Sequence, residues 1–406
     1  MNAKGFEDAG PAFPVQRLGV GEHAIKIEQD RVVSGHLLSA YQKRLARHRG
    51  GLRRWRVSPA RTVAFDTLSG VEKGGYASDL LLVNCARLES RDAGLASEIV
   101  FGVLRYRAQI DYLIEHYAGR PAARLDPEVR TVLRIGIYQL RYLERVPPHA
   151  AVSESVGLVK RARKHSAAGL VNAVLRKVGR EPVDWPSPEI RWSHPGWLLE
   201  RWEREFGSAL AQAIAAAGLR PPGKHVRGDR VQDIGSQAIV PLLDLHPGQS
   251  FLDVCAAPGN KTAQALEMGV RAVACDVNLR RLSALRGLGA DLVAADGTSP
   301  LPFSRRFDRI LLDAPCSGTG TLARNPEIKW RLHPSDILRL RDKQTVLLRN
   351  ALAALTPGGL LVYSTCSLER EENEDVVAGL PVVQTMRRIP GREEGDGFFA
   401  AVIRSD

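Results

Sequence analysis

Residues 251–261 read FLDVCAAPGNK, and this stretch decides the fold of the chain. Its apolar start predicts a strand, Pro258 and Gly259 predict a tight turn, and a helix is expected from near Thr262. Such a turn brings backbone N–H groups close to a ligand at the carboxyl end of a strand, which is where open α/β sheets bind their ligands. The glycine spacing matches neither a G-x-G-x-x-G dinucleotide loop nor a P-loop.

The pattern around this stretch predicts an α/β domain over residues 231–405. Short apolar runs alternate with helical segments, and the runs expected to be strands are residues 250–254, 272–275, 292–295, 309–312 and 359–363. This alternation is typical of a doubly wound, Rossmann-like parallel sheet.

Three acidic residues follow successive strands of this predicted sheet. They are Asp276, Asp296 and Asp313. Because the carboxyl ends of parallel strands share one edge of a sheet, these carboxylates should line a single crevice. The ordinary role of any one such aspartate is a helix N-cap. Three of them in strand order, beside the turn, favour a nucleoside cofactor.

The first half of the chain has a helical pattern instead. Residues 58–182 predict an all-α domain, in which apolar residues recur at helical spacing. Helices are expected over 93–117 and 126–143, the second with Asp126 as its N-cap. Ser153 and Glu154 are expected at the start of a further helix.

Two further segments flank this domain. Residues 183–230 predict a helical linker that ends in a short link rich in proline and glycine, between Leu219 and Val231. Residues 1–57 carry a basic cluster with no sustained apolar period, which predicts a flexible arm.

Charge is concentrated in the front half. Of the net +12, residues 1–57 contribute 11 Lys/Arg against 5 Asp/Glu, and residues 58–185 contribute 19 against 14. This asymmetry suits a basic N-terminal region that binds a polyanion and is followed by a nearly neutral catalytic domain. The sequence has no run of eighteen apolar residues and no signal-peptide pattern, so we expect a cytoplasmic protein that does not enter the membrane.

Five cysteines are spread along the chain without the spacing of a zinc site, and we expect no metal. Cys316 lies in DAPCSGTG and Cys366 in YSTCS, each just past a predicted strand at the edge that carries the aspartates. A buried structural cysteine is the usual alternative. We accept it for Cys85 and Cys275, and we leave Cys255, in the turn itself, open.

Taken together, these motifs resemble a known family. DVCAAPGNK, LLDAPCSGTG, NPEIKW, STCS and EGDGFF occur in this order and make residues 231–405 similar to the Sun/RsmB-type RNA cytosine-5 methyltransferases. LDPEVRTVLRIGIYQL and SAAGLVNAVLRKV make residues 58–182 resemble the NusB-like RNA-binding domain that precedes the catalytic domain in that family.

The resemblance implies a role for each motif residue. Cys366 matches the nucleophile, Cys316 the cysteine that assists release, and Asp313 an acid that meets both cofactor and target cytosine. The implied contacts of the cofactor, S-adenosyl-L-methionine, are Cys255, Ala256, Ala257, Pro258, Gly259, Asn260, Lys261, Asp276, Asp296 and Asp313.

The implied reaction explains why two cysteines and an acid are needed. C5 of cytosine is a poor nucleophile until a thiolate adds to C6 while a carboxyl group near N3 takes up the charge. The target base must leave its stack to reach the site. The resemblance implies a monomer that methylates ribosomal RNA, most closely 16S rRNA.

Three alternatives are weighed against this reading. One is a NusB-like RNA-binding protein with a decayed methyltransferase half, and another is a transfer RNA cytosine-5 methyltransferase. The third is a DNA enzyme, in which the Pro-Cys cysteine would be the nucleophile and Cys366 would not be needed.

Two departures from the family pattern stand out. Asn260 replaces the second glycine of the turn, where we expect asparagine to tolerate a positive φ. The link between Leu219 and Val231 is too short for the small α/β subdomain that family members usually carry there.

Overall fold

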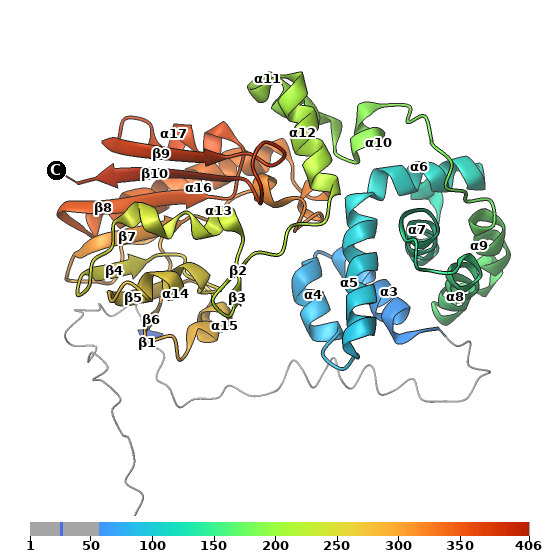
Figure 1. Cartoon of the computed structure of the whole chain (residues 1–406), viewed down its shortest axis with the longest axis horizontal. Coiled ribbons are helices and arrows are strands. Elements are labelled where there is room, and N and C mark those ends of the chain that lie inside the picture. Colours follow the sequence, from blue (N-terminus) through green and yellow to red (C-terminus); the bar gives the residue numbers. More distant parts are fainter. Residues whose placement is uncertain (1–24, 27–56, 406) are drawn as a thin grey trace, which may run out of the picture.

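The computed structural model describes residues 25–26 and 57–405. A bundle of helices and a domain built on a sheet lie side by side, and three further helices connect them (Figure 1). The predicted arm, residues 1–57, falls outside the described residues except for Ile25, Lys26 and Val57. Among the helices of the described part, none combines the length and the apolar character needed to cross a membrane.

The bundle confirms the predicted all-α domain. Its helices are α3 (Pro59–Val71), α4 (Ala77–Asn84), α5 (Ser90–Arg105), α6 (Arg107–Ala118), α7 (Pro127–Tyr142), α8 (Pro148–Arg161) and α9 (Ala168–Leu175). The central helix, α7, packs against α3, α5, α6, α8 and α9, and its apolar residues are almost all buried because it has neighbours on every side.

Two details of the helix prediction are wrong. The helix expected over 93–117 is interrupted at Tyr106 between α5 and α6. Ser153 and Glu154 lie inside α8, which begins at Pro148. Glu154 does not mark a helix start; its carboxylate accepts hydrogen bonds from Ser58 N and Arg61 Nη1, which join α8 to the beginning of α3.

The connecting helices are α10 (Pro188–Trp192), α11 (Gly196–Phe206) and α12 (Ser208–Leu219). After α12 the link contains only a small hairpin of β2 (Val226–Arg227) and β3 (Arg230–Val231). Two hydrogen bonds from Arg227 to Glu267 at the end of α14, 2.5 and 2.6 Å long, hold this hairpin against the sheet domain.

The sheet confirms the predicted doubly wound fold. Its order is β1-β6-β5-β4-β7-β8-β10-β9, and the pairs from β6 to β8 are parallel. The strands are β1 (Ile25–Lys26), β4 (Ser250–Asp253), β5 (Arg271–Asp276), β6 (Asp291–Ala294), β7 (Phe307–Asp313), β8 (Leu355–Thr365), β9 (Val382–Arg388) and β10 (Phe398–Arg404). The sequence did not predict β9 and β10, which extend the sheet by antiparallel pairing.

Helices cover the sheet and connect its strands. They are α13 (Ile234–Gln237), α14 (Asn260–Leu266), α15 (Leu279–Leu282), α16 (Pro334–Ala353) and α17 (Glu374–Val377). Apolar side chains form two separate clusters, one including Leu252 and Leu312 and the other including Phe251 and Leu311. Adjacent strand residues point to opposite faces, so both faces of the sheet are buried, as a parallel sheet requires.

The segment after Cys316 connects the sheet domain to the bundle. Trp330 Nε1 donates to Leu104 O (2.8 Å) and Lys329 Nζ donates to Arg105 O (3.0 Å), both at the end of α5. Arg331 donates to the carbonyl of Val71 (2.6 Å) and to those of the two glycines just after α3. Carbonyl groups at helix ends lack partners within the helix and favour cations. The end of the NPEIKW motif therefore caps α5, and Arg331, the next residue, caps α3.

Candidate active site

Two neighbouring strands bring the predicted catalytic residues together. Strands β7 and β8 are parallel, and Asp313 at the end of β7 is in register with Ser364 near the end of β8. Cys366 follows β8 directly, and Cys316 lies three residues beyond Asp313. Both cysteines are partly exposed at the same carboxyl edge of the sheet.

The two cysteine sulfurs are in contact. Cys316 Sγ lies 3.4 Å from Cys366 Sγ. The hydrogen bond with Cys366, together with burial, raises the pKa of Cys316 well above its usual range. Cys316 therefore stays a neutral thiol and can donate to the Cys366 sulfur when that sulfur is a thiolate.

A lysine and a serine hold the acid beside the cysteines. Lys261 Nζ, from the first turn of α14, lies 2.6 Å from Asp313 Oδ2, and Ser364 Oγ donates to Asp313 Oδ1 at 2.8 Å. Burial opposes the charge of Lys261, but the attraction of Asp313 and its hydrogen bond outweigh burial and raise the pKa of the ammonium. The site thus holds a fixed proton donor next to a carboxylate.

The turn of residues 255–261 is shaped by Gly259. Its φ of +102° is in the left-handed region, and a side chain there would meet Leu285 at 2.6 Å. Our expectation for Asn260 is wrong: Asn260 has no positive φ and is the first residue of α14. Its amide donates to Val231 O at 3.4 Å, so the two departures from the family pattern are in contact.

The aspartates of the sheet edge are not equivalent. Asp276, the last residue of β5, accepts hydrogen bonds from Ala257 N (3.2 Å) and Asn278 N (2.8 Å), and thereby ties the turn to the next strand. Asp296 is exposed and accepts from Thr298 N and Oγ1, which lowers its pKa. Asp296 lies at the predicted edge, but it contacts none of the other site residues through a hydrogen bond.

Two further groups lie beneath the turn. Burial raises the pKa of Asp253 to about 7; Thr262 Oγ1 donates to its Oδ2 (2.7 Å), whereas its buried Oδ1 accepts no hydrogen bond from the described residues. Burial also raises the pKa of Cys255, which packs against one of the apolar clusters of the sheet. The accepted structural role fits Cys275, which is buried, better than Cys85, which is only half-buried.

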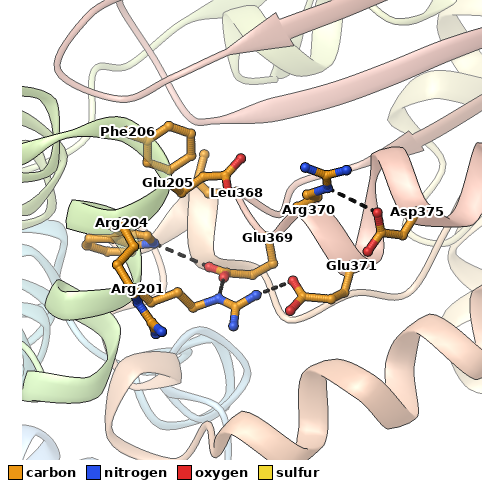
Figure 2. A pocket seen from close by; sticks show the side chains of 10 residues that line it. Arg201, Arg204, Glu205, Phe206, Leu368, Glu369, Arg370, Glu371 and Asp375 are labelled. Carbon is orange, nitrogen blue, oxygen red and sulfur yellow. Dashed lines mark hydrogen bonds and ion pairs between the residues drawn. The ribbon is translucent and has the colours of Figure 1, made fainter.

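The segment that follows Cys366 is anchored on the linker helix α11. Figure 2 shows Arg201 reaching across a small cavity to the carboxylates of Glu369 and Glu371, while Arg370 turns away to Asp375. Trp202 Nε1 also donates to Glu369, at 3.3 Å. The charge of the buried Glu369 is therefore paired with Arg201 of the linker, which fixes the chain beyond Cys366.

The sequence analysis missed the side chains that support the two cysteines. Ser317, Ser367 and Glu372 are buried and bonded to one another behind Cys316 and Cys366. Glu372 lies in the run LEREENED, whose composition is typical of a solvated surface. No local pattern distinguishes it from Arg370 and Asp375, which are exposed in the same run.

The comparisons with known proteins agree with this arrangement. Residues 240–381 match the family model described as 16S rRNA methyltransferase RsmB/F, and residues 58–180 match that of the NusB family. The chain is 32% identical over 409 residues to ribosomal RNA small subunit methyltransferase B of Klebsiella pneumoniae, covering 82% of this chain and 95% of the relative. The same values hold for the protein of that name from Salmonella paratyphi B.

A solved structure has a similar fold over most of this chain. The crystal structure of PH0851 superimposes with a TM-score of 0.70, covering 86% of this chain and 99% of that one, at 20% sequence identity. At this identity the likeness concerns the fold alone.

Proposed function

Because the chain belongs to the family of ribosomal RNA small subunit methyltransferase B, we propose that it transfers a methyl group from S-adenosyl-L-methionine to C5 of a cytosine in 16S ribosomal RNA. The observation that carries the proposal is the pair of sulfurs, Cys316 and Cys366, in contact beside the Lys261–Asp313 ion pair. Two thiols and a proton donor next to a carboxylate are what covalent addition to a pyrimidine, and its reversal, require.

The residues around the turn fit the proposed cofactor. Asp253 Oδ1 is a buried carboxyl oxygen that has no hydrogen-bond partner among the described residues, which suits a cationic group of a ligand. Gly259 has no side chain, so a ligand can approach the backbone of the turn closely. Asp276, which accepts a hydrogen bond from this turn, is the acid proposed for the ribose hydroxyls. When bound, S-adenosylmethionine would supply an electrophilic methyl group.

The chain's own residues would perform the covalent part. The Cys366 thiolate adds to C6, and the electrons of the C5=C6 bond move toward N3, where the Lys261–Asp313 pair holds a proton. After C5 has gained the methyl group, the proton on N3 returns to the Lys261–Asp313 pair. A water molecule then takes the C5 proton, and the electrons of that C–H bond restore the C5=C6 bond and expel the Cys366 sulfur as a thiolate. Cys316, 3.4 Å from that sulfur, is placed to donate to it as it leaves.

The test uses opposite phenotypes for the two cysteines. Purified protein is incubated with 16S ribosomal RNA and labelled cofactor, and the products are resolved on a denaturing gel. Cys366→Ala should give neither methylated RNA nor a covalent band. Cys316→Ala should methylate once and remain attached, which gives a stable protein–RNA band. The reverse pattern would assign the nucleophile to Cys316, and full activity of both variants would exclude covalent catalysis.

The substrate and the cofactor can be tested separately. Transfer RNA in place of ribosomal RNA distinguishes the alternative substrate, and bisulfite sequencing locates the methylated cytosine. Calorimetry should show binding of S-adenosylhomocysteine that Asp276→Ala weakens, whereas binding of NAD instead would contradict the cofactor assignment. Since the proposed RNA-binding domain, residues 58–182, is basic, RNA affinity should fall steeply with salt.

A further inference from the structure

A fully buried carboxylate lies behind both cysteine loops. Glu372 is the last residue of a short helical turn, η7 (Arg370–Glu372), and its side chain is 0% exposed. Its Oε1 accepts from Ser317 N (2.8 Å) and Gln344 Nε2 (3.0 Å). Its Oε2 accepts from the hydroxyls of Ser317 and Ser367, the latter at 2.5 Å. Four donors thus fill the acceptor capacity of one carboxylate.

These donors belong to the neighbours of the two cysteines. Ser317 follows Cys316, and Ser367 follows Cys366. The amide of Gln344, from α16, donates to Glu372 and also to Pro315 O (2.9 Å). Glu372 therefore fixes the residue after Cys316 directly, and the residue before it through Gln344.

We propose that Glu372 is a positioning residue that clamps the two cysteine loops so that the sulfurs of Cys316 and Cys366 stay in contact. The inference rests on the proposed function in one respect: the contact matters because Cys316 assists release of the methylated base. Glu372 itself is enclosed by protein and touches no reacting atom. Its effect is on geometry, and a displacement of about 1 Å can lower the rate of a chemical step by about 10²-fold.

Removing the clamp should displace Cys316 more than Cys366. The Cys366 loop keeps other anchors, because Gly320 N donates to Cys366 O (2.9 Å) and Asn373 Nδ2 donates to Ser367 O (3.0 Å). Ser317 bonds only with Glu372 and Ser367 among the described residues. Loss of Glu372 is therefore expected to impair release while adduct formation continues.

Glutamine provides a conservative replacement that separates geometry from charge. In Glu372→Gln the amide oxygen can replace Oε1 and accept from Ser317 N and Gln344. The amide NH2 can replace Oε2 and donate to the two serine hydroxyls, which rotate to accept. The clamp is kept without its charge, whereas Glu372→Ala removes it and leaves buried donors unsatisfied.

The first experiment measures how fast the two sulfurs form a disulfide, which reports their placement without RNA or cofactor. Full-length protein is treated with diamide, a diazene that takes two electrons and two protons from two thiols to give one disulfide and a hydrazine. Peptide mass spectrometry follows the Cys316–Cys366 disulfide with time. Wild type and Glu372→Gln should react at similar rates, and Glu372→Ala at least about tenfold more slowly, because effective molarity depends strongly on placement.

The matched control is Asp308→Ala. Asp308 Oδ2 accepts from Ser250 N (2.8 Å) and Ser250 Oγ (2.7 Å). Like Glu372 with Ser317, it binds both the N–H and the hydroxyl of one serine, but it lies at the opposite end of the sheet. Its loss should lower stability without changing the disulfide rate. Should Glu372→Ala fail to fold, Ser317→Ala removes one of the clamp bonds and should slow the reaction by about threefold.

The second experiment uses the RNA gel. Glu372→Ala should accumulate the covalent band seen with Cys316→Ala, and Glu372→Gln should release its product as wild type does. The proposal is overturned if Glu372→Ala forms the disulfide at the wild-type rate, or if Glu372→Gln is as slow as Glu372→Ala. If wild type does not methylate RNA at all, the proposed function fails, but the disulfide rates still decide the clamp.

Discussion

Gly320 is a position where the backbones of the two cysteine loops are in direct contact. It follows Cys316 by four residues and forms part of a helical turn, η5 (Thr319–Thr321). Its N–H donates to Cys366 O and its carbonyl accepts from Gly397 N (2.8 Å). A Cβ added to Gly320 would lie 2.5 Å from Gly397 O and 2.8 Å from Cys366 O. Both obstacles are backbone atoms, which no change of rotamer can move.

We predict that Gly320→Ala lowers catalysis far more than stability. Relief of these contacts needs a shift of about 0.5–1 Å in the backbone that carries Cys366, because carbon contacts are favourable only near about 3.5 Å. Overpacking of this size costs about 1–3 kcal/mol, and about 0.4–1 kcal/mol of it is offset by the stiffer unfolded chain. The same shift at the nucleophile should slow adduct formation by about 10²-fold.

The assay is the rate of covalent adduct formation in a Cys316→Ala background, with unfolding in urea measured in parallel. The control is Gly94→Ala in helix α5, where an added Cβ meets nothing within 4 Å and should leave the adduct rate unchanged. An adduct rate for Gly320→Ala within about twofold of the parent would refute the reasoning, since the loops would then adjust without moving the sulfur.

Three further predictions concern the buried charges and the domain contact. Burial lowers the pKa of Lys329 below the 10.5 of the unfolded chain, so the unfolded state holds more protons and stability rises with pH toward 10.5. In urea titrations, the stability of Lys329→Met relative to wild type should fall by up to about 1.4 kcal/mol per pH unit across that window; a constant difference would contradict it. Burial raises the pKa of Asp253 from 3.8 to about 7, so the folded state holds the extra proton between these values. The stability of the wild type should therefore fall as the pH rises from about 4 to about 7, and Asp253→Asn should show a flatter profile over this range. Arg331→Ala should destabilise the protein by about 1–3 kcal/mol in the same titrations, because it leaves helix-end carbonyls without their donor, whereas the exposed Arg339→Ala should have little effect.

The sequence predicted those features that depend on local pattern. Strands β4 to β8 lie within a few residues of the predicted runs, since buried parallel strands are short and apolar. The contact of Cys316 with Cys366 follows from two cysteines placed just beyond adjacent parallel strands. The family resemblance implied separate roles for Asp313 and Lys261, and the ion pair between them was not predicted.

The features that the sequence did not predict depend on distant contacts. The break at Tyr106 has no helix breaker; instead, the carbonyls of Leu104 and Arg105 accept hydrogen bonds from the other domain and not from the next helical turn. Glu372 is buried because four donors from three segments meet at it, which no hydrophilic run in the sequence indicates. Asn260 is tolerated because the left-handed residue of the turn is Gly259.

Because Trp330 and Arg331 cap helices that are made much earlier, the order of synthesis delays these caps. Arg331 lies 260 residues after Val71, and Trp330 lies 226 residues after Leu104. At about 5–20 residues per second, a ribosome needs about ten seconds to nearly a minute to deliver these side chains after it has made the helices they cap. During that interval the carbonyls that these residues cap at the ends of α3 and α5 are left to hydrogen-bond with water. A chain that ended before Trp330 and Arg331 would therefore lack the caps of both helices, which favours local opening of their ends.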